Sequence, residues 1–490
     1  ADNSPPLNAP LRSDTYSAEH LWDHAQELAR REQVERKSRA RNVAVARQFV
    51  ERFESNCLYI ASAYQRVIDS VRAGEPIATD AEWLIDNFYV VEEQLREIRE
   101  DLPSSYYREL PKLATPPWVG YPRVWELAYE LVVHTDSSLD EELIAGFVSA
   151  YQQVTPLTSG EIWAIPIMLR LVLVENLRRL CGHMLLTRDA WKEARRTLQN
   201  WQQGSVAKLP SADLEHCSTL VMTLIECLRD YGADYGVGMH ELTERIGKSQ
   251  EDIDLCVRHE QQRLAANQVS IGNVITSMRL LTALDWTLFF ERVSLVDQLL
   301  RRDPAGVYGS MDFATRDHYR HQVEQLAKRS GREEIDIASK AVDLATHAQR
   351  QGTHDSRQLH VGFFLIDDGR RELERDVAYW PTIGERFTRF AKRFPNLLYL
   401  GSTALLTAAG VAALVFALHG AGATAVACAL VGVLAVLPAS ELAIGLVNFL
   451  VTTLLRPQML PKLEFLEHIP SGSHAMVVMP TLLTSQSGAE

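Results

Sequence analysis

The chain has 490 residues, enough for two or three domains, and 46% of them are hydrophobic, enough to fill a core. Its formal net charge of −13 argues against a nucleic-acid-binding protein, which needs a basic surface to contact phosphates. Its six cysteines lie far apart and lack metal-ligand spacing, which predicts free, mostly buried thiols in a reducing compartment.

The spacing of apolar residues before the membrane segment predicts an all-α fold. Residues 1–16 are polar and proline-rich, so we expect a disordered N-terminus without a secretory signal, followed by a helix from Ser17. From there apolar residues recur at helical spacing, and strict alternation is rare. Further helices are expected over 43–72, 79–101, 122–134, 139–153, 162–180, 187–201, 211–229, 249–266, 270–283, 285–301, 314–329 and 333–350.

One interruption of the helical pattern predicts a boundary within this region. Gly, Ser and Pro residues break the pattern over 202–213, which divides the helical part into subdomains 17–203 and 204–385. A membrane segment is expected over 386–455. Residues 456–490 are expected to hold a linker and a strand over 474–484, the first strand of a domain that is itself missing.

The membrane segment is predicted by an uncharged stretch. Phe394 to Ser440 spans 47 residues without Asp, Glu, Lys or Arg. Leu398–Leu418 is long enough to cross the bilayer, the sequence at 419–422 favours a turn, and Ala423–Leu455 returns, with a kink expected at Pro438. Basic residues flank both ends, so the positive-inside rule puts both ends on the cytoplasmic side. The alternative is a hairpin buried in a large soluble protein.

A basic and aromatic segment precedes the first span. On a helix its arginines fall on one side and its phenylalanines on another, a pattern typical of a helix that lies on a membrane surface. We call this segment the membrane collar, and its residues are Arg386, Phe387, Arg389, Phe390, Lys392, Arg393 and Phe394.

Catalytic residues are harder to find. Asp86, His134, Asp136 and Glu161 could belong to a carboxylate-based carbohydrate-active site. The sequence favours structural roles for them: an ion-pair face on the helix over 79–101, a helix end with an Asx turn at 134–136, and a capping box with Thr158. There is no P-loop, GxGxxG, HExxH, GxSxG or zinc motif, so we assign no catalytic, cofactor-binding or metal residue.

Several long segments resemble the N-terminal region of bacterial cyclic β-1,2-glucan synthases. They include "GYPRVWELAYELVVHTDSSLDEELIAGF", "SIGNVITSMRLLTALDWTLFFERVSLVDQLLRRDPAGVYGSMDF", "HVGFFLIDDGRRELE" and "LPASELAIGLVNFLVTTLLRPQMLPKLEF". The resemblance runs from about residue 17 to residue 484. It implies a part of a large inner-membrane enzyme that builds its glucan from UDP-glucose, with the N-terminal region in the cytoplasm.

The resemblance also implies what should follow this region in the chain. A glycosyltransferase domain, which would bind UDP-glucose with or without a divalent metal, is expected after the first membrane pair, and this sequence ends before its motifs. We therefore expect a non-catalytic part that anchors and positions the transferase and contacts the bilayer and other domains of the same synthase. Two alternatives are a carbohydrate-active helical domain and a regulatory or assembly module for a membrane complex.

Overall fold

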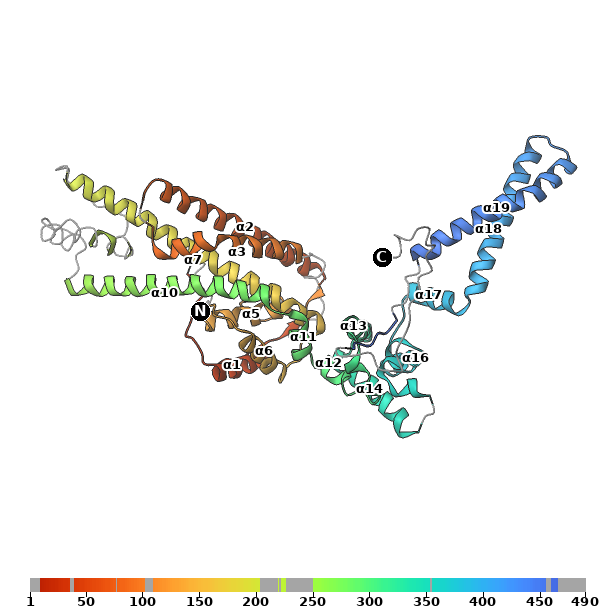
Figure 1. Ribbon diagram of the computed structural model, residues 1–490, viewed down its shortest axis with the longest axis horizontal. Helices are drawn as coiled ribbons and strands as arrows, with labels where there is room; N and C mark the ends of the chain where they lie inside the picture. Colours follow the sequence, from red (N-terminus) through yellow and green to blue (C-terminus); the bar gives the residue numbers. More distant parts are fainter. Residues whose placement is uncertain are drawn as a thin grey trace, which may run out of the picture. The chain divides into compact units, whose positions relative to one another are not determined.

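The computed structural model describes residues 9–35, 39–75, 77–101, 109–202, 219, 222–225, 250–352, 355–454 and 460–465. The described residues form helices almost throughout, so the predicted all-α class is confirmed (Figure 1). Contacts divide the chain into two compact units, residues 1–295 and 296–490. The predicted boundary at residues 203 and 204 and the predicted strand over 474–484 lie outside the described residues.

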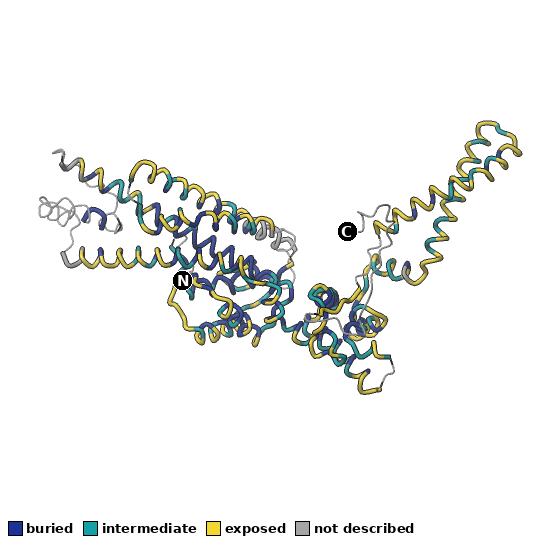
Figure 2. Tube along the Cα trace, in the orientation of Figure 1, coloured by how far each residue is buried: buried dark blue, intermediate teal, exposed yellow. Residues whose placement is uncertain are grey.

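The first unit is a helical bundle with a buried centre, which Figure 2 shows in dark blue. Its longest helices, α2, α3, α7 and α10, pack side by side, and α7 contacts each of the other three. Helices α5 and α11 also contact α7, while α1 contacts α5 and α6. The elements of this unit are α1 (Ala18–Arg31), β1 (Val34–Glu35), α2 (Arg39–Arg72), α3 (Thr79–Asp101), β2 (Lys112–Leu113), α5 (Arg123–His134), α6 (Glu141–Gln152), α7 (Ser159–Gln202), α10 (Gln250–Ala283) and α11 (Trp286–Val293).

Two pairs of predicted helices are each one continuous helix. The segments 162–180 and 187–201 both lie in α7. The segment 270–283 and the described part of the segment 249–266, which starts at Gln250, both lie in α10. The residues between the paired segments include no proline, and a single glycine such as Gly182 costs a helix only about 1 kcal/mol. Conversely, the predicted helix over 285–301 is interrupted at Ser294, which separates α11 from α12 (Leu295–Leu300).

Residues 9–16 are ordered, in contrast to the disorder predicted for residues 1–16, of which residues 1–8 lie outside the described residues. The backbone N–H of Leu11 donates to Asn176 Oδ1 at 2.7 Å, and the Leu11 side chain is buried. The backbone N–H groups of Ser13 and Tyr16 donate to carbonyl groups at the C-terminal end of α5. Ser17 is the N-cap of α1, where its side chain accepts from the backbone N–H of His20.

The second unit has its own core of short helices. Leu300, Val323, Ile337 and Leu365 are fully buried there, each from a different helix. Helix α13 (Phe313–Ser330) is capped by Gly331, whose φ of +73° is the left-handed conformation that glycine adopts without strain. The helices before the hairpin are α12, η1 (Tyr308–Ser310), α13 (Phe313–Ser330), α14 (Glu334–Arg350), η2 (Ser356–Leu359), α15 (Val361–Ile366), α16 (Arg370–Asp376) and α17 (Ile383–Arg393).

Two long apolar helices follow α17 and pack against each other. Helix α18 (Pro395–Gly420) and helix α19 (Ala425–Leu454) are both long and apolar enough to cross a membrane. The turn falls where it was predicted, with Gly422 at φ +87°. Tyr399 donates to Asn448 Oδ1 at 3.0 Å across the pair, and a Cβ at Gly432 would lie only 3.2 Å from Val415. Pro438 is accommodated within α19.

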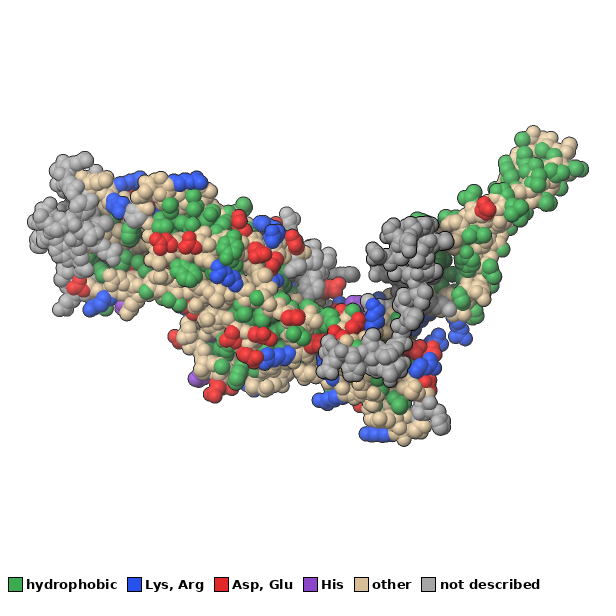
Figure 3. Space-filling model, viewed as in Figure 1, with side chains coloured by type: hydrophobic (Ala, Val, Ile, Leu, Met, Phe, Trp, Pro, Cys, Tyr) green, Lys and Arg blue, Asp and Glu red, His purple; other side chains and the backbone are tan. Residues whose placement is uncertain are grey.

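The hairpin is exposed rather than buried. No residue of α18 is buried, and α19 buries only Cys428, Gly432, Ala443 and Val447. Hydrophobic side chains are spread along the visible face of this hairpin, with one acidic side chain among them (Figure 3). The alternative of a hairpin buried in a soluble core therefore does not describe this structure, and an apolar surface of this extent requires a nonaqueous environment or a partner.

Candidate functional site

Glu161 is a structural residue at the start of α7. Its backbone N–H donates to Thr158 Oγ1 at 3.2 Å, and its carboxylate accepts from the Thr158 backbone N–H at 2.9 Å, which is the predicted capping box. Arg123 on α5 donates to both carboxylate oxygens, at 2.8 and 2.6 Å. Both side chains are buried, so this forked ion pair is sequestered from solvent.

His134 and Asp136 hold the loop after α5. Asn273 and Ser270, both on α10, donate to the backbone oxygen and to the carboxylate of Asp136. The His134 ring bonds to the Asp14 carbonyl at 2.9 Å and to Glu130 at 3.3 Å. Burial opposes the charged ring, but these two hydrogen bonds outweigh it and raise the pKa of His134.

The structure does not bring the four candidate residues into one catalytic constellation. Asp86 is exposed on α3, whereas Glu161 is fully buried between α5 and α7. The paired carboxylates of a glycosidase must both face an open substrate groove. Asp86 is in contact with solvent but Glu161 is not, so these two carboxylates do not meet that requirement. Glu161 contacts Arg123 of α5, whereas the Asp136 carboxylate accepts from Ser270 of α10. The hydrogen bonds of Asp136 therefore go to another helix and not to the expected Asx turn.

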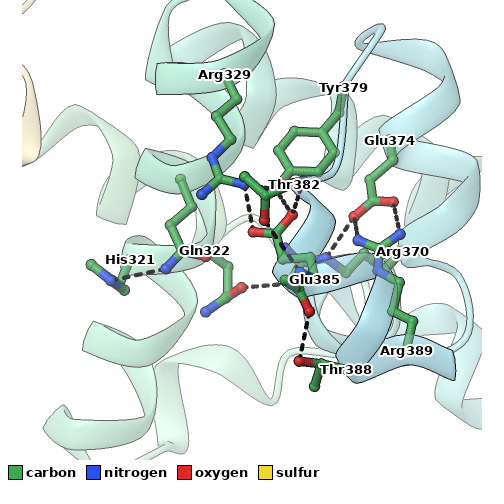
Figure 4. Close-up of polar contacts among 12 residues, drawn as sticks. His321, Gln322, Arg329, Arg370, Glu374, Tyr379, Thr382, Glu385, Thr388 and Arg389 are labelled. Atoms are coloured by element: carbon green, nitrogen blue, oxygen red, sulfur yellow. Dashed lines mark hydrogen bonds and ion pairs between the residues drawn. The ribbon is translucent and has the colours of Figure 1, made fainter. Parts of the chain in front are cut away.

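A second polar cluster lies where α17 meets the rest of the second unit (Figure 4). Arg389 of α17 donates to both carboxylate oxygens of Glu374 on α16, at 2.8 and 2.5 Å. Arg370, one helical turn before Glu374, donates to the same carboxylate at 2.9 Å. Glu374 is only 7% exposed, so two guanidinium groups neutralise a nearly buried charge. The hydrogen bonds to Glu374 raise the pKa of Arg389.

Glu385 ties the N-terminus of α17 to the same cluster. It forms a capping box with Thr382, accepts from Tyr379 Oη at 2.8 Å, and pairs with Arg329 of α13 at 2.6 Å. Burial opposes ionisation of Glu385, but these donors outweigh it and lower the pKa of its carboxyl. We call Arg329, Arg370, Glu374, Tyr379, Glu385 and Arg389 the juxtamembrane network.

The predicted membrane collar is divided between two roles. Arg389 points into the juxtamembrane network, so its charge is compensated within the protein. Arg386 and Arg393 are exposed, and the three phenylalanines are also exposed, between 43% and 53%. The rings of Phe390 and Phe394 lie 5.4 Å apart, with the Arg393 guanidinium 5.8 Å from the Phe394 ring. The side chain of Lys392 lies outside the described residues.

Sequence reasoning missed most of the juxtamembrane network. Its one local signal was the Thr382–Glu385 spacing, which is that of a capping box. The pairing of Glu374 with Arg389 joins two helices separated by a turn, and a sequence pattern does not determine which arginine of a helix turns inward.

Comparison with known proteins confirms the resemblance found in the sequence. The chain is 31% identical over 447 residues to the cyclic beta-(1,2)-glucan synthase NdvB of Rhizobium meliloti (strain 1021). The match covers 90% of this chain but only 16% of that synthase, so the chain corresponds to a region of a much larger enzyme. No family model matches the chain.

Proposed function

We propose that the chain is the membrane-anchoring and scaffolding part of a synthase of this kind, and that it has no catalytic centre of its own. The hairpin of α18 and α19 crosses the inner membrane, and the first unit and the helices of the second unit up to α17 stay on the cytoplasmic side. The observation that carries the proposal is that no residue of α18, an apolar helix of 26 residues, is buried. Such a helix is stable in the hydrocarbon of a bilayer and unstable in water.

The juxtamembrane network supports a mechanical role. It joins α17 to α13 and α16 through Glu385 and Glu374. The helix that directly precedes the span is therefore fixed to the other helices of the second unit. The exposed phenylalanines and arginines of the collar suit the boundary between headgroups and acyl chains. The short helices of the second unit would therefore be held at a defined orientation on the bilayer, near which a UDP-glucose-dependent transferase domain of the same protein could dock.

A non-catalytic role predicts that membranes containing this chain form no glucan from UDP-glucose. After incubation with radiolabelled UDP-glucose, with and without Mg²⁺, the amount of label on the chain and in oligosaccharide should not exceed the amount found with membranes that lack the chain. Label that appears with the wild-type chain and disappears with D86A or D136A would contradict the proposal and support a carboxylate site. A complete synthase assayed in parallel shows that the assay detects transfer.

A further inference from the structure

Three potential metal ligands converge between the first helix and α5. His24 of α1 places Nε2 2.9 Å from Glu130 Oε2, and His134 places Nε2 3.3 Å from the same oxygen. The three ligand atoms all lie within 4.8 Å of one another. Glu130 and His134 are four residues apart on α5, which puts them on one face of that helix.

The surroundings orient these groups as ligands. The carbonyl oxygen of Asp14 lies 2.9 Å from His134 Nδ1 and can only accept, so Nδ1 carries the hydrogen and Nε2 faces Glu130. The Tyr16 ring stacks on His134, with 4.0 Å between the ring centroids, and contacts His24 edge-on at 5.6 Å. Arg31 pairs with the other oxygen of Glu130 at 3.4 Å, which leaves Oε2 for the two histidines.

This geometry leaves a place for a cation. With Nδ1 donating to Asp14, His134 presents Nε2 to a carboxylate oxygen, and this pair of groups needs a cation between them, either a proton or a metal ion. The cluster is open enough for an ion to enter, because the His24 and Glu130 side chains are 17% and 16% exposed. The site is distinct from the juxtamembrane network, which lies in the second unit.

We propose that His24, Glu130 and His134 bind one divalent metal ion of the zinc class, which links α1 to α5. Two imidazole nitrogens and one carboxylate oxygen suit Zn²⁺ and its neighbours rather than Mg²⁺ or Ca²⁺, which prefer oxygen ligands. At zinc–ligand distances of about 2.0–2.1 Å, tetrahedral ligands lie about 3.4 Å apart. Two of the three separations here are already within half an ångström of that value, and water would complete the coordination.

Zinc binding to the tag-free, detergent-solubilised full chain tests the proposal. After treatment with a chelator, the wild-type chain should bind one equivalent of Zn²⁺ in isothermal titration calorimetry, and the metal should raise its melting temperature. H24Q and H134Q should each weaken binding by at least about tenfold. Co²⁺ bound to the wild type should show the visible absorption of a low-symmetry four-coordinate site, and that absorption should be lost in both variants.

His20 offers a matched control, because it lies one turn before His24 on α1 and is exposed. H20Q should bind zinc as the wild type does. Circular dichroism of each metal-free variant shows whether it is folded. If only one of H24Q and H134Q is folded, that variant alone is compared with the wild type. Absence of a stoichiometric zinc site in the wild type, or binding that H24Q and H134Q leave unchanged, would overturn the proposal and leave a proton as the cation of the cluster.

Discussion

The E161Q substitution should lower the free energy of unfolding of the first unit by about 3 kcal/mol. Glutamine keeps the capping-box spacing but removes the charge that compensates Arg123, which is only 5% exposed. An unpaired buried charge typically costs about 3–5 kcal/mol. Hydrogen exchange followed by mass spectrometry can measure the effect, because it reports the opening of α5 and α7 separately from the rest of the chain.

Two further variants make the E161Q result specific. Glu93 on α3 is about half exposed and pairs only loosely with Arg96, at 3.8 Å, so E93Q should change stability by no more than about 0.5 kcal/mol. The double substitution R123M/E161Q removes both charges and should be less destabilised than E161Q alone. Equal protection of α5 and α7 in the wild type and E161Q would contradict a structural role for Glu161.

The R389M substitution should release α17 from α16 and destabilise that contact by about 2 kcal/mol. Methionine retains the aliphatic bulk of arginine but removes both hydrogen bonds to the nearly buried Glu374. A hydrogen bond to a charged group contributes about 1.5–3 kcal/mol to the free energy of unfolding. Arg370 still neutralises Glu374, which keeps the expected loss below that of a wholly unpaired charge. Faster hydrogen exchange in α16 and α17 is the expected observation.

Arg386 is the matched control for Arg389, because it lies one turn earlier on α17 and is exposed, with no ion pair to the described residues. R386M should leave exchange in α16 and α17 within about 0.5 kcal/mol of the wild type. If R386M and R389M had equal effects, the juxtamembrane network would not be what fixes α17.

Sequence patterns predicted the fold class and the hairpin because both depend on local composition. The uncharged stretch from Phe394 and the turn at Gly422 required no knowledge of tertiary contacts. The order of residues 9–16 could not be predicted in that way. That segment is held by Asn176, Val133 and His134, which lie more than 100 residues away in the sequence.

The candidate sites show the same limit. The capping box correctly predicted the local role of Glu161, but its partner Arg123 comes from another helix. The i,i+4 spacing of Glu130 and His134 is visible in the sequence, whereas His24 joins them only through the packing of α1 against α5. Spacing within one helix identifies two ligands of the cluster, and tertiary structure supplies the third.

Site-directed labelling with a membrane-impermeant maleimide tests the membrane anchor most directly. Ala421 lies in the turn between α18 and α19, and Arg386 and Leu460 lie on either side of the hairpin; all three are exposed. In intact spheroplasts, A421C should react, whereas R386C and L460C should react only after lysis. The labelling of each variant is measured above the labelling of the wild-type chain, which has six cysteines of its own. A421C that is protected until lysis, or R386C that reacts from outside, would contradict a hairpin that crosses the membrane with both ends in the cytoplasm.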